Sequence, residues 1–553
     1  MRLRSRLLRL LPGLVIVASV AVVYQNSCNG PFIFDDIRAI RDNPRIRRLV
    51  PDRVVTPTVE RTALAGRPVA RLSFAINYAL GGLDPWGYHL FNVTALALAA
   101  LVVFGVIRRT AGGPRVSSPR ESEATGTAMA VAVLWSVHPL LTGPVDYLVN
   151  RTELLMGLFM LMTLYCVMRG SASRQATRWY SLAVISCALG MGCKEVMAAA
   201  PLLVLLYDRT FLSGSFSEAL RRRCGLYFGL ACTWFLLAAL VMSTNFRVKL
   251  GAGFPRFTPW EYALTQTEVL VHYLRLAFWP QPLVLDYLDW PIAIWSPRLV
   301  LCTATVLLLV ALTAVGVWRR TWWGFAGAWF LLILAPTSSF LPLLGEVAAE
   351  RRMYLPLIAV VLVAVVLARR GLDSLLARRP VSTSFRRWLP SLLVVLAAVG
   401  LGAAASNRNE SFRSALVIWS DTATKRPNNY GALTEVGCAL AEEGKVQQAV
   451  PYYLRAIRLR PDYSFAHANL GVVLLGEGRL RDAEAELSEA LRLNPELPEV
   501  HYNLGLVYAK LGRFDEAIKQ FEESLRLAPE LTLGREMLQR ARTAQRASGS
   551  PSH

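Results

Sequence analysis

Hydrophobic and polar positions divide the chain into two parts. Up to about residue 406, long apolar runs alternate with short basic connections, and beyond it polar segments take over. A helix needs about 20 mostly apolar residues to cross a bilayer. We therefore expect about eleven spanning helices, the first ending near Tyr24 and retained rather than cleaved. The other ten are expected at 88–107, 126–142, 151–168, 180–193, 195–207, 225–243, 298–317, 323–337, 353–368 and 388–406.

The short basic connections predict the orientation of these helices. All of them fall on the side of the N-terminus if the stretch 258–282 does not span, and the excess of Lys and Arg makes that side cytoplasmic. The stretch 258–282 contains Glu261, Gln266, Glu268, His272 and Arg275 and is typical of a helix lying at the membrane interface. The loop 25–87 and the C-terminal tail are then expected on the outer face.

The tail repeats with a period of 34 residues. Pro427, Pro461, Pro495 and Pro529 keep this spacing, and so do glycines and alanines between them. This period is typical of tetratricopeptide repeats, which we expect at 428–461, 462–495 and 496–529. A linker helix at 407–427 precedes them, and a capping helix with a disordered tail follows at 530–553. Stacked repeats form a concave surface for peptides or partner proteins; a spacer or dimerisation arm is the alternative.

Composition agrees with a membrane part joined to a polar part. The chain of 553 residues is 54% hydrophobic and 18% charged, whereas soluble proteins average about 25% charged residues. From Asn407 onward 19 basic residues balance 19 acidic ones, so the formal charge of +21 belongs to the first 406 residues. Because that charge stands between apolar runs, nucleic acid is not expected as a partner. The eight cysteines form no CxxC and are expected to be buried apolar residues.

Candidate chemistry gathers in the expected outer loops. Asp35 and Asp36 follow the first apolar run, and one carboxylate of such a pair can act as a general base or bind a cation while the other shifts its pKa. A solvated turn or helix cap is the alternative. Ionisable groups near the outer ends of spans mark a site or a buried ion pair. They are Arg67, His89, His138, Asp146, Arg151, Glu153, Lys194, Glu195, Glu346, Glu350, Arg351 and Arg352.

Five segments in this order resemble one family. They read FIFDDIRAIRDNPRIR, RPVARLSFAINYALGGLDPWGYHLFNV, HPLLTGPVDYLVNRTELLMGLF, GCKEVMAAAPLLVLLYD and SSFLPLLGEVAAERRMYLP, with the repeats following. Together they resemble the transmembrane and tetratricopeptide-repeat O-mannosyltransferase-like proteins, which belong to the GT-C class of multispanning glycosyltransferases. The resemblance implies an all-α GT-C-type membrane helix bundle over 1–406 followed by an α-solenoid of repeats.

The resemblance also implies an activity and roles for residues. A sugar, mannose in the family, would pass with inversion from a polyprenyl- or dolichyl-phosphate donor to a hydroxyl, as of protein Ser or Thr, on the non-cytoplasmic face. Asp35 would be the general base with Asp36 assisting, and Arg351 or Arg352, with Arg67 behind them, would bind the donor phosphate. The substrate pocket would contain His89, His138, Asp146, Arg151, Glu153, Lys194, Glu195, Glu350 and Tyr354. No metal or other cofactor is expected, Mg²⁺ or Mn²⁺ at the aspartate pair being the alternative.

One motif departs from the family pattern. Family members often carry a Thr-Glu pair after the His-Pro pair, whereas this chain has Thr142-Gly143 there, and Asp146 is the nearest carboxylate that follows. A non-catalytic scaffold whose repeats recruit envelope proteins is therefore the alternative to a glycosyltransferase. A transporter or polymer ligase is a third, although the first 406 residues show no inverted symmetry. A bacterial inner membrane, with the repeats in the periplasm, is the expected location.

Overall fold

The computed structural model describes residues 2–47, 49, 62–112, 121–243, 258–338, 346–378, 382–529 and 531–548. Every regular element within these ranges is helical. The chain forms two compact units: unit 1 contains Met1–Leu285 and Trp290–Ser414, and unit 2 contains Asp286–Asp289 and Ala415–His553. Three expected features lie wholly or partly outside the described residues: the basic connection with Arg115 and Arg120, most of positions 50–61 of the expected outer loop, and the tail at 549–553.

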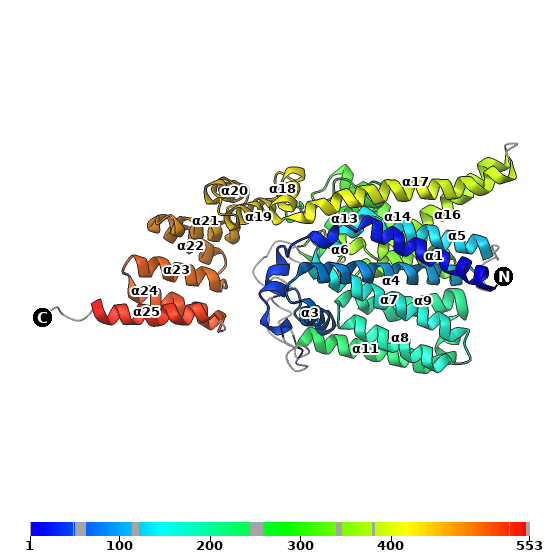
Figure 1. The fold of residues 1–553 in the computed structure, drawn as a ribbon, viewed down its shortest axis with the longest axis horizontal. Coiled ribbons are helices and arrows are strands. Elements are labelled where there is room, and N and C mark those ends of the chain that lie inside the picture. Colours follow the sequence, from blue (N-terminus) through cyan, green and yellow to red (C-terminus); the bar gives the residue numbers. More distant parts are fainter. Residues whose placement is uncertain are drawn as a thin grey trace. The chain divides into compact units, whose positions relative to one another are not determined.

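Unit 1 is a bundle of long helices joined by short helical turns (Figure 1). Its elements are α1 (Arg2–Val23), η1 (Ser27–Asn29), η2 (Ile37–Arg41), η3 (Pro44–Ile46), α3 (Pro68–Gly81), α4 (Pro85–Ala111), α5 (Glu121–Ser136), η4 (Pro139–Leu141), α6 (Thr142–Asp146), η5 (Leu148–Asn150), α7 (Arg151–Ser171), α8 (Ala176–Met191), η6 (Glu195–Ala199), α9 (Ala200–Tyr207), η7 (Asp208–Leu212), α10 (Phe216–Arg222), α11 (Cys224–Met242), α13 (Pro259–Phe278), α14 (Pro297–Trp318), α15 (Trp322–Leu334), η8 (Glu350–Met353), α16 (Pro356–Ala377), α17 (Thr383–Asn409) and η9 (Glu410–Arg413).

Several of these helices have the length and composition to cross a membrane. Among the described residues, five helices meet these criteria, and the number of candidate spans rises to seven if each of two bent helix pairs counts as one span. The five are Pro85–Ala111, Leu148–Ser171, Cys224–Met242, Pro297–Trp318 and Ser384–Arg413. The bent pairs are Ser122–Ser136 with Pro139–Asp146 and Glu195–Leu212 with Phe216–Arg222.

The expected number of eleven spans is therefore not confirmed. Leu10–Val23 and Trp322–Leu334 are apolar but shorter than the five, and α8 and α16, where two further spans were expected, do not meet the same criteria. The stretch 258–282 forms α13, which is not among the five, and its place at a membrane interface stays a prediction.

Close helix packing in unit 1 depends on small residues. Helix α7 packs against both α4 and α8, and α14 packs against α15. In the α14–α15 hairpin a Cβ on Gly324 would stand 2.1 Å from the carbonyl carbon of Gly316. Only glycine permits this approach, which brings the two backbones into contact as in many membrane helix pairs.

The first and last helices of unit 1 are joined by asparagine side chains. The Nδ2 of Asn26 donates to the carbonyl oxygen of Ser406 at 3.0 Å and to Glu410 at 2.8 Å. In return the Nδ2 of Asn409 donates to the carbonyl oxygen of Val23 and to the Oδ1 of Asn26, both at 3.0 Å. These bonds fix the end of α1, and hence the start of the loop that carries Asp35, against the end of α17.

Unit 2 is built from paired helices with the predicted period. Its elements are α18 (Ala415–Lys425), α19 (Tyr430–Glu442), α20 (Val446–Leu459), α21 (Ser464–Gly476), α22 (Leu480–Leu493), α23 (Pro498–Lys510), α24 (Phe514–Leu527) and α25 (Thr532–Ser548). The first helices of the three pairs begin 34 residues apart, and so do the second helices. The all-α fold with a C-terminal tetratricopeptide-repeat part is thus confirmed.

The repeated glycines have one packing role. A Cβ on Gly437, Gly471 or Gly505 would stand 2.5 to 2.7 Å from a side chain of the partner helix in the same repeat. The two helices of each pair therefore cross at a position that has no room for a side chain.

Candidate active site

The loop after α1 separates the two adjacent aspartates into different environments. Asp36 is fully buried, and its carboxylate accepts hydrogen bonds from the backbone N–H of Val149 at 2.7 Å and of Ile33 at 3.2 Å. Asp35 is half-buried, and its own backbone N–H donates to the hydroxyl of Tyr147 at 3.1 Å. Asp36 therefore fastens the loop to the start of α7, while the Asp35 carboxylate stays accessible.

Backbone conformation contributes to this separation. Phe34, directly before the pair, has φ of 47°, a left-handed conformation that non-glycine residues rarely adopt. The chain then enters η2 with Asp36 at its N-cap position. The sharp turn directs consecutive side chains differently, which their adjacency in the sequence does not reveal.

Burial raises the affinity of both carboxyls for protons. For Asp36, burial raises the pKa to about 8, and the charge of Asp35 raises it too. Hydrogen bonds from three backbone N–H groups lower it. For Asp35 burial also raises the pKa, while the hydrogen bond from Tyr147 and the charges of Arg351 and Arg38 lower it. A carboxyl with a raised pKa is a stronger base than a free aspartate, as general base catalysis requires.

Asp35 belongs to a group of charged side chains that we call the charge cluster: Asp35, Arg67, Glu153, Lys194, Glu195, Glu346 and Arg351. Three ion pairs organise it: Arg351 with Glu346, Lys194 with Glu153, and Arg67 with Glu195, the last at 3.2 Å. The members come from α7, η6 and η8 and from the connections that precede η2, α3, η6 and η8.

Electrostatic coupling joins the pairs to one another. Burial lowers the pKa of Lys194, and the charges of Arg67 and Arg351 lower it further, while Glu153 raises it. Burial would raise the pKa of Glu346, but Arg351, Arg352 and Lys194 lower it to about 2. Glu346 is thus ionised, and with 44% of its side chain exposed it is the most accessible partner of Arg351. An anion arriving at this cluster would compete with that carboxylate for the guanidinium.

Arg352 and Glu350 flank the cluster and bind the backbone. The guanidinium of Arg352 is buried and donates to the carbonyl oxygens of Thr337 at 3.1 Å and Val347 at 3.2 Å, and also to that of Glu346. Glu350 accepts from the backbone N–H of Val284 at 2.7 Å. These two side chains hold the connections around η8, so of the two adjacent arginines Arg351 is the one placed beside Asp35.

Tyr354 and the two histidines also have structural partners. The Tyr354 ring packs on Trp135 with centroids 5.2 Å apart. His89 contacts the carbonyl oxygen of Gly30 at 3.1 Å. In His138 the Nδ1 accepts from the N–H of Leu140 at 3.2 Å, so the neutral ring carries its proton on Nε2, which bonds the carbonyl oxygen of Ala277 at 3.1 Å.

Arg151 is a buried structural arginine. Its guanidinium donates to Asn92 at 2.8 Å, to Asn77 at 2.6 Å, and to the carbonyl oxygens of Ser73 and Tyr88 at 3.2 and 2.9 Å. It also lies 4.2 Å from the ring centroid of Phe74. It thereby ties α3, α4 and α7 together at the end where the charge cluster lies.

Asp146 lies in a different buried cluster, beside Ser27 and Arg408. It is 2% exposed, and neither of its carboxylate oxygens has a hydrogen bond of normal geometry to the described residues. Asp146 therefore does not take the place of the missing Thr-Glu carboxylate within the charge cluster.

The structure thus brings together Asp35, Arg67, Glu153, Lys194, Glu195 and Arg351 of the predicted residues, and adds Glu346 and Tyr147. Tyr147 was not predicted, because nothing in its sequence context distinguishes it from a core tyrosine. No group of three or more His, Cys, Asp or Glu within the described ranges is arranged to hold a metal ion.

Fold and site together define a multi-pass helical membrane protein with a buried, charged site and a tetratricopeptide-repeat unit. A profile of the tetratricopeptide repeat family matches residues 435–482 and 468–531. Mouse Protein O-mannosyl-transferase TMTC3 (Mus musculus) is 26% identical over 82% of this chain and 51% of its own length. Drosophila melanogaster Protein O-mannosyl-transferase Tmtc3 is 27% identical over 83% of this chain and 56% of its own.

Homologues of this chain are therefore the TMTC protein O-mannosyl-transferases, which confirms the family resemblance found in the sequence. The chain spans about half the length of these curated relatives. Among solved structures, the crystal structure of MamA protein is 22% identical over 24% of this chain and 71% of its own, with a TM-score of 0.22.

Proposed function

We propose that this chain is a membrane glycosyltransferase that moves a sugar from a polyprenyl- or dolichyl-phosphate donor to an acceptor hydroxyl on a protein. The observation that carries the proposal is the half-buried carboxylate of Asp35, with its raised pKa, beside Arg351 in the charge cluster. The names of the relatives, protein O-mannosyl-transferases, support the same class of reaction and suggest mannose.

In the proposed reaction Asp35 accepts the proton of the acceptor hydroxyl as its oxygen attacks the anomeric carbon. The bond between that carbon and the donor phosphate breaks, and its electron pair stays on the lipid phosphate. Arg351 then exchanges Glu346 for the phosphate oxygen, since a guanidinium binds both anions through the same donors. Lys194 and Arg67 add positive charge near the leaving group.

Asp36 assists by position rather than by proton transfer. Its two backbone hydrogen bonds hold the loop against Val149, next to Tyr147, whose hydroxyl contacts the backbone of Asp35. We further propose that no divalent metal is needed, because the basic residues of the charge cluster neutralise the leaving group. Transfer that persists in excess EDTA is the expected result, and complete loss restored by Mg²⁺ or Mn²⁺ would contradict it.

Asp35→Asn tests the base directly. In membranes supplied with labelled polyprenyl-phosphate sugar, it should reduce transfer by roughly 10²- to 10⁴-fold, the usual contribution of a general base. The matched control is Asp42→Asn, in the same loop, whose carboxylate is exposed and pairs with Arg41; it should transfer normally. Normal transfer by folded Asp35→Asn protein would exclude the proposed base, whereas absence of transfer by the wild type would favour the scaffold.

We place the charge cluster and the repeats on the non-cytoplasmic face, in the periplasm of a bacterial inner membrane, where the repeats hold the acceptor or a partner that presents it. Stacked helix pairs support this role because they form an extended binding surface. Single cysteines at residues 42 and 479 test it: both should react with an impermeant maleimide in intact cells. Reaction of only one of them would contradict the shared compartment.

A further inference from the structure

A large cavity lies in unit 1, and its rim is at the end of the helices away from the charge cluster. It has a volume of about 590 Å³ and is lined by residues of α4, α5, α7, α9, η7, α15 and α16. On α7, Leu164 of the cavity stands eleven residues after Glu153 of the cluster, which is about 16 Å along the axis. On α16, Arg369 stands thirteen residues after Pro356, or about 20 Å. The lining on α16 begins at Ile358, two residues after Pro356, so the cavity extends along the helices, and its rim at Arg369 is the part that lies away from the candidate active site.

The inner wall of the cavity is aromatic and aliphatic. The rings of Tyr207, Phe211 and Phe325 contact one another, with centroids 4.8 to 5.5 Å apart. Val106 and Leu164 extend this wall from α4 and α7. A volume of this size falls within the range of about 300–1,000 Å³ that is typical of ligand pockets. A surface of this kind suits a hydrocarbon chain.

The rim is basic. Arg320, Arg369 and Arg370 line it, facing the carboxylates of Glu123 and Asp373. Arg369 is engaged, with Glu123 at 3.5 Å and Asp373 at 4.0 Å. Within the described part of the chain the guanidinium of Arg320 has no acidic partner, and that of Arg370 only lies 5.8 Å from the ring of Trp322. Two arginines at the rim are therefore free of carboxylates in these ranges.

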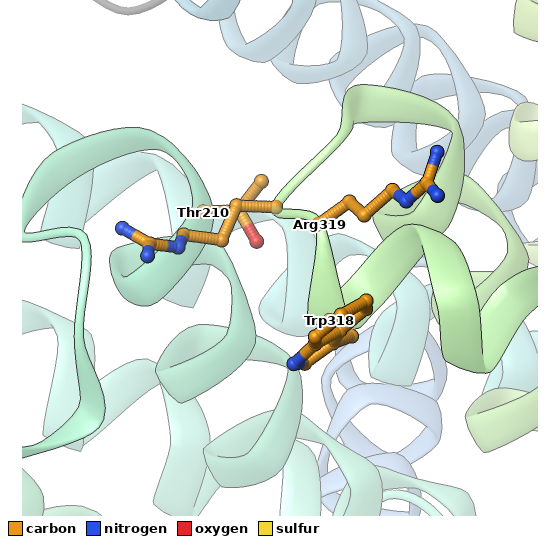
Figure 2. A pocket seen from close by; sticks show the side chains of 4 residues that line it. Thr210, Trp318 and Arg319 are labelled. Carbon is orange, nitrogen blue, oxygen red and sulfur yellow. The ribbon is translucent and has the colours of Figure 1, made fainter.

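The turn that carries Arg320 is held in place. Arg209 of η7 donates to the carbonyl oxygens of Val317 and Trp318 at the end of α14. Arg320 itself has φ of 57°, a left-handed conformation normally taken by glycine at such a helix end. Figure 2 shows Thr210 of η7, Trp318 and Arg319 around the adjoining open pocket, which Arg320 also lines.

We propose that this cavity binds an anionic phospholipid of the surrounding membrane, with an acyl chain against the aromatic wall and the phosphate at Arg320 and Arg370. Charge complementarity favours an anionic headgroup, and basic pockets between membrane helices bind such lipids in other proteins. The donor lipid is a poorer candidate, because a phosphate at this rim would lie far from Asp35 along the helices. The proposal does not depend on the proposed transferase activity.

The test is native mass spectrometry of the full chain, delipidated and supplied with equal amounts of phosphatidylglycerol and phosphatidylethanolamine. The wild type should retain phosphatidylglycerol at least tenfold better. Arg320→Ala with Arg370→Ala should abolish that preference. The control pair, Arg174→Ala with Arg178→Ala, removes the same charge from exposed positions, one between α7 and α8 and one in the first turn of α8, and should keep the preference.

A second variant separates the tail from the headgroup. Val106→Phe fills the cavity without changing the arginines, so it should also lower retention of phosphatidylglycerol. If the arginine double variant does not fold, this variant still tests the proposal. Equal retention of both lipids by the wild type, an unchanged preference in the arginine double variant, or unchanged retention of phosphatidylglycerol in Val106→Phe would overturn the proposal. Displacement of phosphatidylglycerol by polyprenyl phosphate would assign the cavity to the donor instead, and displacement by inorganic phosphate would leave only an anion site.

Discussion

The buried carboxyl of Asp36 makes the stability of unit 1 depend on pH. Its pKa is about 8 in the folded protein, against an ordinary value of 3.8, because burial disfavours the charged form. The unfolded chain therefore releases this proton first, and folding loses free energy as pH rises from about 4 to about 8. At about 1.4 kcal/mol for each pH unit, the interval from pH 5 to pH 8 corresponds to about 4 kcal/mol.

Asp36→Asn removes this titration while keeping the shape and an acceptor for the N–H of Val149. We expect the thermal midpoint of the wild-type protein in nanodiscs, followed by tryptophan fluorescence, to fall by several degrees between pH 5 and pH 8. The midpoint of Asp36→Asn should change much less. Asp35 contributes a dependence of the same sign, since burial raises its pKa too.

Glu346 does not interfere in this interval. Its pKa is lowered to about 2, so its contribution is complete above its ordinary value of 4.5 and is lost only as pH falls toward 2. The exposed Asp42→Asn serves as a control and should follow the wild type. Parallel curves for the wild type and Asp36→Asn from pH 5 to pH 8 would refute the assignment of Asp36 as a buried, protonated anchor.

Three further substitutions test the packing. Arg151→Lys should lower the thermal midpoint strongly, because each acceptor that lysine leaves unsatisfied costs about 1–3 kcal/mol. A near-normal midpoint would show that the several hydrogen bonds of the guanidinium are not needed. Gly471→Ala should destabilise unit 2 by about 1–3 kcal/mol, since its Cβ would stand 2.7 Å from Leu487. The control is Gly476→Ala on the same helix, where a Cβ has no neighbour within 4 Å, and it should be neutral or stabilising. Hydrogen exchange in unit 2 measures the effect of each glycine substitution, and equal effects would contradict the close helix crossing at Gly471. Asp146→Asn should lower the midpoint, because it removes the buried carboxylate that lies beside Ser27 and the buried guanidinium of Arg408; a raised midpoint would show that this carboxylate is a net cost to folding.

The repeats could be predicted from the sequence almost completely, because their period is local. Each helix pair forms from residues less than 34 positions apart, so the spacing of Gly437, Gly471 and Gly505 already encodes the crossing. The apolar runs of the first 406 residues predicted helices equally well. They did not predict that two of the runs bend, by 56° and 104°.

The members of the candidate site were predicted better than their roles. Asp35 and Asp36 are equivalent as neighbours in the sequence, and only the fold buries one against Val149. Arg351 and Arg352 divide in the same way, one toward Glu346 and the other toward backbone carbonyls. Such outcomes depend on partners far away along the chain, which residue types alone do not specify.

The asparagine contacts between α1 and α17 have a consequence for biosynthesis. Asn26 leaves the ribosome early, but its bonding partners Ser406, Asn409 and Glu410 are translated 380 to 384 positions later. Until α17 is made, the side-chain amide of Asn26 lacks these partners, and the contact between α1 and α17 cannot form. A translation product that ends before α17 consequently lacks every one of these partners of the Asn26 side chain.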